Sequence, residues 1–292
     1  MRFQLDLTKE YGIVLEGGGA RGSYQIGAWK ALREAGIKIR GIAGASVGAL
    51  NGALICMDDL EKAEEIWENI RYSQVIDVDD DVIETVKKLD LKSLDLVKVA
   101  EDAKRILKDK GLDITPLKNL IESVVDEDKI RSSDRELYLT TYSVTDRELL
   151  VLNAKDIPDG EIGDMLLASA YFPAFRNDKL GGKRYLDGGG WNNVPINILL
   201  EHDYKDILVI RIYGLGYDSE RTTEIPKDVH VTHIAPRQDL GGILEFDRTR
   251  ARKNMTLGYY DAKRVLYGLE GRWYYLYAPE SDVYYFLSLI HI

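Results

Sequence analysis

Several features that would point to particular classes of protein are scarce or missing in this sequence. A single cysteine, Cys56, excludes an internal disulfide, and its apolar helical surroundings predict an inert, buried thiol. No apolar run reaches the length of about 18 residues that a membrane-spanning helix needs. Residues 1–6 lack the apolar core of an ordinary secretory signal peptide. We therefore expect a soluble cytoplasmic protein that is at most peripheral to membranes.

Positive charge is scarce as well. The chain has 39 Lys and Arg against 49 Asp and Glu, which gives a formal net charge of −10. Because phosphate backbones are bound by basic surfaces, this balance argues against nucleic acid as a partner. It also argues against simple electrostatic adsorption to anionic membranes. Hydrophobic residues make up 45% of the 292 residues, enough for a sizeable core, and no repeat or linker divides the chain. We expect one domain over 1–292.

Short apolar strands alternate with helices in the first half of the chain. The pattern predicts strands at 11–15 and 38–43 and helices at 22–35, 46–57 and 59–70. This alternation indicates an α/β fold with a mostly parallel central sheet and helices on its faces. The right-handed crossover rule brings the carboxyl ends of the first two strands to one edge of the sheet, where such folds bind ligands.

A second α/β half follows a charged, amphipathic helical insertion at about 73–113. The insertion is either an ordinary solvated excursion or a lid over the active site. Strands at 136–144 and 147–153 are expected to form a hairpin, and a short strand at 183–186 ends in Asp187. The remaining predicted elements are helices at 116–125, 163–170, 195–201 and 248–269 and strands at 207–213 and 229–234.

The clearest chemical signal is a serine between two glycines, in the motif GASVG at 44–48. It lies between a predicted strand and a helix of small residues, which is the setting of a nucleophile elbow. The glycines leave the Ser46 hydroxyl uncrowded, and the helix N-terminus favours negative charge beside it. Ser46 is the candidate nucleophile. On this motif alone, a glycine-rich turn with an ordinary N-cap serine is the alternative interpretation that stays open.

A second glycine-rich loop, GGGARG at 17–22, follows the first strand. The N–H groups of Gly17, Gly18 and Gly19 are unobstructed by side chains and can form a nest for an oxyanion. The same loop contains the GxGxxG spacing of dinucleotide sites. However, the second strand leads into the serine turn and offers no acidic residue for a ribose, and the loop lacks the Lys-Ser/Thr pair of a P-loop. We interpret it as an oxyanion loop.

Asp187, at a strand end before three glycines, is the candidate base. A serine hydroxyl is a poor nucleophile until a neighbouring group accepts its proton. An aspartate before glycine is also common in ordinary turns. A triad would need His202, His230, His233 or His291, and the chain order would fit an α/β-hydrolase. None of the four has a glycine-rich or strand-end setting.

In chain order, GGGARG (17–22), GASVG (44–48) and DGG (187–189) resemble the motifs of patatin-like phospholipases and lipid acyl hydrolases. The small-residue segment 168–173, which ends in proline, resembles a further block of that family. Together the blocks span residues 11 to about 195, roughly two thirds of the chain.

The resemblance implies a three-layer α/β/α fold and a Ser–Asp dyad that requires no histidine, metal or cofactor. It assigns the nucleophile to Ser46, the base to Asp187 and the oxyanion hole to the glycines at 17–19. Arg21 matches a basic position of the family's loop, where it either holds the shape of the loop or meets a lipid head group.

The implied function is that of a serine lipid acyl hydrolase of the phospholipase A type. Its substrates would be carboxylic esters of phospholipids or related lipids at a membrane or micelle surface. Two alternatives stay open on the sequence. One is a broad carboxylesterase or thioesterase that uses the same residues on soluble acyl esters. The other is a lipid-binding regulatory protein with a silent site.

Overall fold

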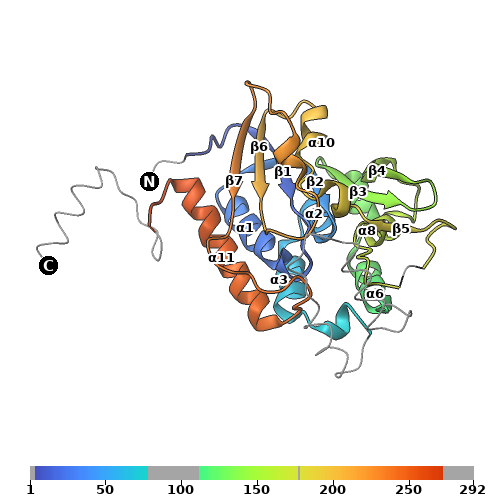
Figure 1. Cartoon of the computed structure of the whole chain (residues 1–292). Helices are drawn as coiled ribbons and strands as arrows, with labels where there is room; N and C mark the ends of the chain where they lie inside the picture. Colours follow the sequence, from blue (N-terminus) through green and yellow to red (C-terminus); the bar gives the residue numbers. More distant parts are fainter. Residues whose placement is uncertain (1–3, 78–111, 177, 272–292) are drawn as a thin grey trace, which may run out of the picture.

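The computed structural model describes residues 4–77, 112–176 and 178–271 (Figure 1). Within these ranges, seven strands form one sheet. The strands are β1 (Glu10–Leu15), β2 (Lys38–Ala45), β3 (Glu136–Ser143), β4 (Glu148–Asn153), β5 (Tyr185–Asp187), β6 (Asp206–Ile210) and β7 (His230–Ile234). The helices are α1 (Ser23–Glu34), α2 (Val47–Cys56), α3 (Leu60–Asn69), α6 (Thr115–Val124), α7 (Glu127–Ser132), α8 (Ile162–Ser169), α9 (Gly189–Asn192), α10 (Ile196–Glu201) and α11 (Arg248–Tyr267).

The strand order is β4-β3-β2-β1-β6-β7, with β5 also paired to β3. β1 lies between β2 and β6, β2 also pairs with β3, and β7 pairs with β6, all in parallel. The antiparallel pairs are the β3–β4 hairpin and the short β5, which also pairs with β3. The predicted mostly parallel α/β sheet and its hairpin are confirmed.

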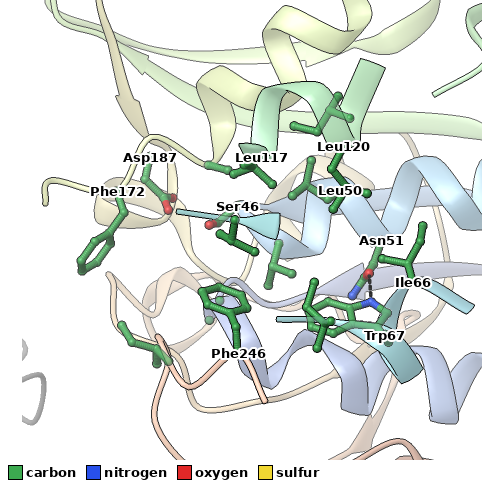
Figure 2. A pocket seen from close by; sticks show the side chains of 18 of the residues that line it. Ser46, Leu50, Asn51, Ile66, Trp67, Leu117, Leu120, Phe172, Asp187 and Phe246 are labelled. Carbon is green, nitrogen blue, oxygen red and sulfur yellow. Dashed lines mark hydrogen bonds between the residues drawn. The ribbon is translucent and has the colours of Figure 1, made fainter. Parts of the chain in front are cut away.

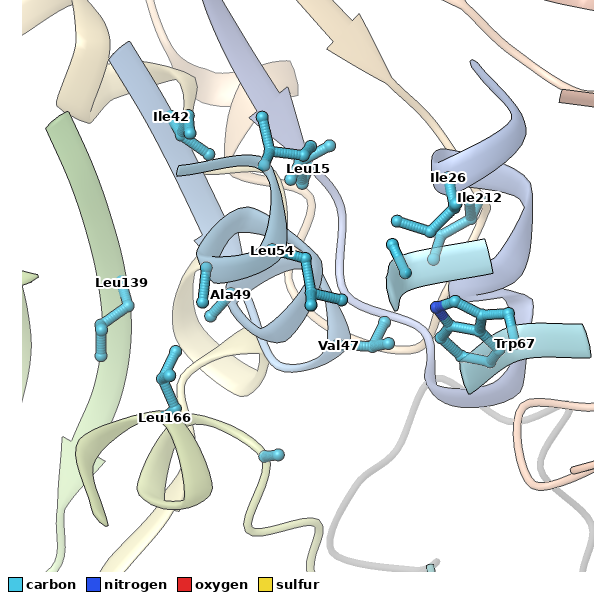
Figure 3. Close-up of a cluster of buried hydrophobic side chains, with 14 of the residues drawn as sticks. Leu15, Ile26, Ile42, Val47, Ala49, Leu54, Trp67, Leu139, Leu166 and Ile212 are labelled. Atoms are coloured by element: carbon cyan, nitrogen blue, oxygen red, sulfur yellow. The ribbon is translucent and has the colours of Figure 1, made fainter. Parts of the chain in front are cut away.

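Helices cover both faces of the sheet, as a three-layer α/β/α fold requires. Alternate strand residues point to opposite faces, so Ile13 and Leu15 join the core under α1, α2, α3 and α11. Val14 and Ala43 join a smaller core with the side chains of α10 on the other face. Figure 3 shows part of the larger core, with Leu15 of the sheet and side chains of α1, α2 and α3 among the residues drawn.

The long α11, from the end of the described chain, packs against α1 (Figure 1). Two glycines let the helix backbones approach closely. A Cβ at Gly27 would lie 1.8 Å from the Met255 carbonyl oxygen, and one at Gly258 would lie 2.0 Å from the Tyr24 carbonyl oxygen. This contact fixes the start of α11 and therefore the segment 240–246 that leads into it.

Most expected elements lie within a few residues of their predicted bounds, while the short α7 and α9 were not expected. At the insertion, the Asp77 N–H donates to the Asp113 carbonyl over 2.8 Å, so the chain leaves and returns at one place. The predicted helices and lid over 78–111 lie outside the described residues. The single-domain expectation for 1–292 stays a prediction. Every helix in the described part of the chain is too short or too polar to cross a membrane.

Candidate active site

Ser46 lies on the sharp turn that joins β2 to α2. Its backbone has φ 54° and ψ −126°, a conformation that non-glycine residues rarely adopt. The flanking glycines leave no room for a side chain, because a Cβ at Gly44 would lie 2.4 Å from the Gly48 carbonyl oxygen. The Ser46 side chain makes no capping hydrogen bond to α2, so it is not an ordinary N-cap serine. The expected strand–turn–helix setting is present, with strain of the kind that collects at functional sites.

The sheet brings Asp187 to Ser46 because two strands meet end to end along the same side of β3. β2 runs parallel to β3 and ends with Ala45 opposite Thr140. β5 runs antiparallel to β3 and ends with Asp187 opposite Thr141, the next residue along. The two strand ends therefore converge on adjacent positions. Figure 2 shows the Ser46 hydroxyl and the Asp187 carboxylate pointing toward one another.

The Asp187 carboxylate is held by its own turn. Its Oδ1 accepts a hydrogen bond of 2.8 Å from the Gly189 N–H, and its backbone N–H donates to the Tyr171 carbonyl over 2.8 Å. Burial raises the pKa of Asp187 from 3.8 to about 6, and hydrogen bonds from the Ser46 side chain and the Gly189 N–H partly oppose this shift. At pH 7 the group is mostly ionised, and it binds a proton more tightly than an exposed aspartate does.

The three glycines of the predicted oxyanion loop differ in what their N–H groups do. The Gly17 N–H donates to the Asn193 carbonyl over 3.2 Å, so this donor is not free to bind an oxyanion at Ser46. Gly18 and Gly19 line the pocket at Ser46, and within the described ranges neither N–H has an acceptor. The loop therefore presents two of the three expected donors. Val47, which follows the serine at the start of α2, also lines the pocket, and its N–H is a further candidate donor.

Arg21 binds backbone carbonyls of two neighbouring segments. Its Nε donates to the Gly241 carbonyl over 2.7 Å, and its guanidinium also donates to the carbonyls of Ile212 and Tyr213. These contacts hold the loop in shape, which is one of the two roles expected for Arg21. Beside it, Gly19 has φ +56°, and a Cβ there would lie 2.1 Å from the Ile243 carbonyl oxygen. Only glycine fits at this position without strain.

An apolar pocket extends away from Ser46 and Asp187 between α2, α3 and α6 (Figure 2). Its lining is almost entirely aliphatic and aromatic, and includes Leu50, Ile66, Trp67, Leu117, Leu120, Phe172 and Phe246. The polar Asn51 is fully occupied with protein groups. It accepts from Trp67 Nε1 over 3.0 Å and donates to Gly22 and Gln25 over 2.9 and 2.8 Å. The pocket is therefore suited to a hydrocarbon chain.

The described histidines lie elsewhere. His202 stacks on Tyr138, with ring centroids 4.4 Å apart, and His233 Nε2 lies 2.6 Å from a Glu220 carboxylate oxygen. Neither of them, nor the exposed His230, lines the pocket at Ser46. His291 lies outside the described residues. The structure thus brings one titratable carboxylate, and no histidine that it describes, to the serine.

Two polar residues that support the site were not identified as such from the sequence. The Ser169 hydroxyl accepts a hydrogen bond of 3.0 Å from the Ser46 N–H; its only signal was its place in the family-like block 168–173. Glu16, 2% exposed, accepts from the N–H groups of Ile212 and Tyr213 over 2.7 and 2.9 Å and pairs with Arg211 over 3.0 Å. Glu16 directly precedes the oxyanion loop, so these contacts fix the position of its first residue.

The chain is similar to known proteins in sequence and in fold. The family model described as patatin-like phospholipase matches residues 13–200. Lysophospholipase nte1 of Aspergillus terreus is 58% identical over 50 residues, and Neuropathy target esterase sws of Drosophila sechellia is 57% identical over 47. These matches cover 17% and 16% of this chain but only 3% of each relative's length. The crystal structure of VipD from Legionella pneumophila shares the fold, with a TM-score of 0.50 and 14% identity over 87% of this chain and 66% of that one.

Proposed function

The chain belongs to the patatin-like phospholipase family, and from this premise we propose that it is a serine lipid acyl hydrolase. It cleaves carboxylic ester bonds of phospholipids or related lipids at a membrane or micelle surface, where such substrates reside. The observation that carries this proposal is the facing pair of Ser46 and Asp187 at one end of an apolar pocket. Each part of the site has a task in such a reaction.

In the first half-reaction, the Ser46 hydroxyl attacks the ester carbonyl carbon while Asp187 accepts its proton. The carbonyl oxygen becomes an oxyanion that the N–H groups of Gly18 and Gly19 stabilise. Collapse of this intermediate breaks the ester bond, and the departing alcohol takes the proton from Asp187. The acyl group stays on Ser46 as an ester.

In the second half-reaction, Asp187 removes a proton from a water molecule, which attacks the acyl-enzyme. The oxyanion again forms against the loop, and its collapse releases the fatty acid and returns the proton to Ser46. The raised pKa of Asp187, about 6, suits both steps. A base works best when its pKa lies close to the working pH.

The pocket supports a lipid acyl group over a small soluble one. Each buried methylene contributes about 0.8 kcal/mol of favourable transfer free energy. An acyl chain that extends from Ser46 past Leu50 toward Trp67 would be surrounded by apolar side chains over this length. The alcohol part of the lipid then lies on the side of Ser46 away from the pocket.

A lipid panel with mass analysis of the products, run beside the Ser46→Ala variant, tests the proposal. We expect fatty acid release by the wild-type protein and none by the variant. Turnover of a short p-nitrophenyl ester excludes the silent lipid-binding alternative. A rate that rises when the substrate forms micelles separates a lipase from an esterase or thioesterase of soluble esters. Equal products from both proteins would refute the assignment of Ser46.

A further inference from the structure

We propose that Asn193 is a positioning residue that couples the turn carrying Asp187 to the oxyanion loop. This inference rests on the proposed function, and it concerns how the two halves of that site stay in register. Asn193 is 2% exposed and lies at the pocket, between the two segments.

The first link joins Asn193 to the oxyanion loop. Its carbonyl accepts from the Gly17 N–H over 3.2 Å, and its side-chain Nδ2 donates to the Gly17 carbonyl over 3.2 Å. One residue thus satisfies both polar backbone groups of Gly17. The next two residues, Gly18 and Gly19, line the pocket, and within the described ranges their N–H groups have no protein acceptor.

The second link joins Asn193 to the base. The Asn193 N–H donates to the Tyr217 carbonyl, and the Tyr217 N–H donates to the Gly189 carbonyl, each over 2.9 Å. The Gly189 N–H in turn donates to Asp187 Oδ1 over 2.8 Å. A continuous series of hydrogen bonds therefore runs from Gly17 through Asn193 to the carboxylate of Asp187.

The segment 214–217 that carries Tyr217 is tightly enclosed between the two linked parts. A Cβ at Gly214 would lie 1.8 Å from the Gly17 carbonyl oxygen, and one at Gly216 would lie 2.2 Å from the Gly189 carbonyl oxygen. No side chain fits at either position. Close backbone packing on both sides makes the connection stiff as well as continuous.

Stiffness matters here because oxyanion hydrogen bonds strengthen in the transition state and contribute little to substrate binding. A displacement of about 1 Å at a catalytic group costs on the order of 100-fold in rate. Loosening Gly17 should therefore lower kcat and leave KM nearly unchanged. A residue with a merely structural role would not produce this split.

The neighbouring Asn192 provides a matched control. It is 3% exposed, and its side chain bonds Asn197 and Ser219 instead of Gly17. Asn193→Ala and Asn192→Ala each remove a buried amide, so both should lower the melting temperature to a similar degree. Only Asn193→Ala should lower kcat, by about 10- to 100-fold, with KM within about threefold of wild type.

A trifluoromethyl ketone analogue of the substrate gives a second measurement, because its adduct with Ser46 places an oxyanion in the loop. Its affinity should fall in Asn193→Ala by the same factor as kcat/KM. If Asn193→Ala does not fold, Asn193→Asp keeps the shape, removes the Nδ2 donor and should show the same loss.

Equal kcat values for the two alanine variants, whether both high or both low, would overturn the coupling role of Asn193. So would a trifluoromethyl ketone affinity that is unchanged in a folded variant of lower kcat. A wild-type protein that hydrolyses no acyl ester would refute the proposed function itself, and the inference with it.

Discussion

Ser46 and Asp187 lie side by side, but the chain holds them by different means. Ser46 is held mainly by local structure, because β2, the turn and α2 follow one another; one distant hydrogen bond joins its N–H to the Ser169 hydroxyl. Its unfavourable feature is the backbone conformation at φ 54°. Asp187 is held by a three-residue strand, by the hydrogen bond from its own N–H to the Tyr171 carbonyl and by the hydrogen bond that its carboxylate accepts from the Gly189 N–H. Its unfavourable feature is a partly buried charge. Backbone strain and carboxylate burial are thus separate costs of one site, and each can be tested alone.

The largest effect is expected at the base. Asp187→Asn should abolish nearly all of kcat, because asparagine keeps the size of aspartate and cannot accept a proton. The single changes His202→Gln, His230→Gln, His233→Gln and His291→Gln should each retain most of it. The measurement is kcat on one ester for all five variants. Collapse of activity in any folded histidine variant would replace the dyad with a Ser–His–Asp triad.

A smaller loss is expected from the oxyanion loop. Gly18→Pro deletes one N–H donor, and loss of a single such donor costs about 10²–10³ in kcat in other hydrolases. Gly18→Ala controls for crowding, because it adds a Cβ at the same place, 2.8 Å from Ile212 Cδ1, and keeps the N–H. Proline also forces φ from 164° to about −65°, so the folding of both variants is checked by their melting temperatures. If both variants lose the same activity, crowding is the cause and the Gly18 N–H is not a donor.

The partly buried charge of Asp187 should appear in the pH dependence of activity. A general base must be ionised, so kcat/KM should fall as the pH decreases through about 6, the raised pKa of Asp187. A limb near 3.8, the ordinary value, would show that the carboxylate is solvated in the free enzyme. A pH–rate profile of the wild-type protein distinguishes the two.

The same pKa predicts the sign of a change in stability. A carboxyl group whose pKa is higher in the folded than in the unfolded state binds protons more tightly when folded. Its stabilising contribution is therefore present below about 3.8 and is lost as the pH rises through about 6. We therefore compare the melting temperature of Asp187→Asn with that of the wild-type protein at two pH values. The difference should favour the variant more at pH 7.5 than at pH 4. A difference that does not change with pH would contradict the raised pKa.

How far the sequence predicts each half of the site follows from the same contrast. The setting of Ser46 could be predicted because a strand, a glycine-rich turn and a helix are all local patterns. Asp187 was found by its glycines, but its approach to Ser46 depends on the short β5 pairing with β3, and three residues carry no periodic signal. The commitment of the Gly17 N–H to Asn193 depends on the packing of distant segments, so the glycines at 17–19 look equivalent in the sequence.

The smallest effect is expected from the strain at Ser46. Replacement of Ser46 by Ala and by Gly removes the same hydroxyl, so both variants should be inactive and unlabelled by a fluorophosphonate. They differ in how well they tolerate φ 54° and ψ −126°. A strained conformation of this kind costs about 1–3 kcal/mol for a residue with a Cβ, and a glycine loses about 0.4–1 kcal/mol through the larger entropy of its unfolded chain. Ser46→Gly should therefore be more stable than Ser46→Ala by about 1 kcal/mol, measured by urea unfolding at constant pH.

Asp187 has no positive φ, so at that position the order should be reversed, with Asp187→Gly less stable than Asp187→Ala. Equal stability of the two Ser46 variants would show that the turn relaxes when the hydroxyl is gone, and that the side chain of Ser46 maintains the strain.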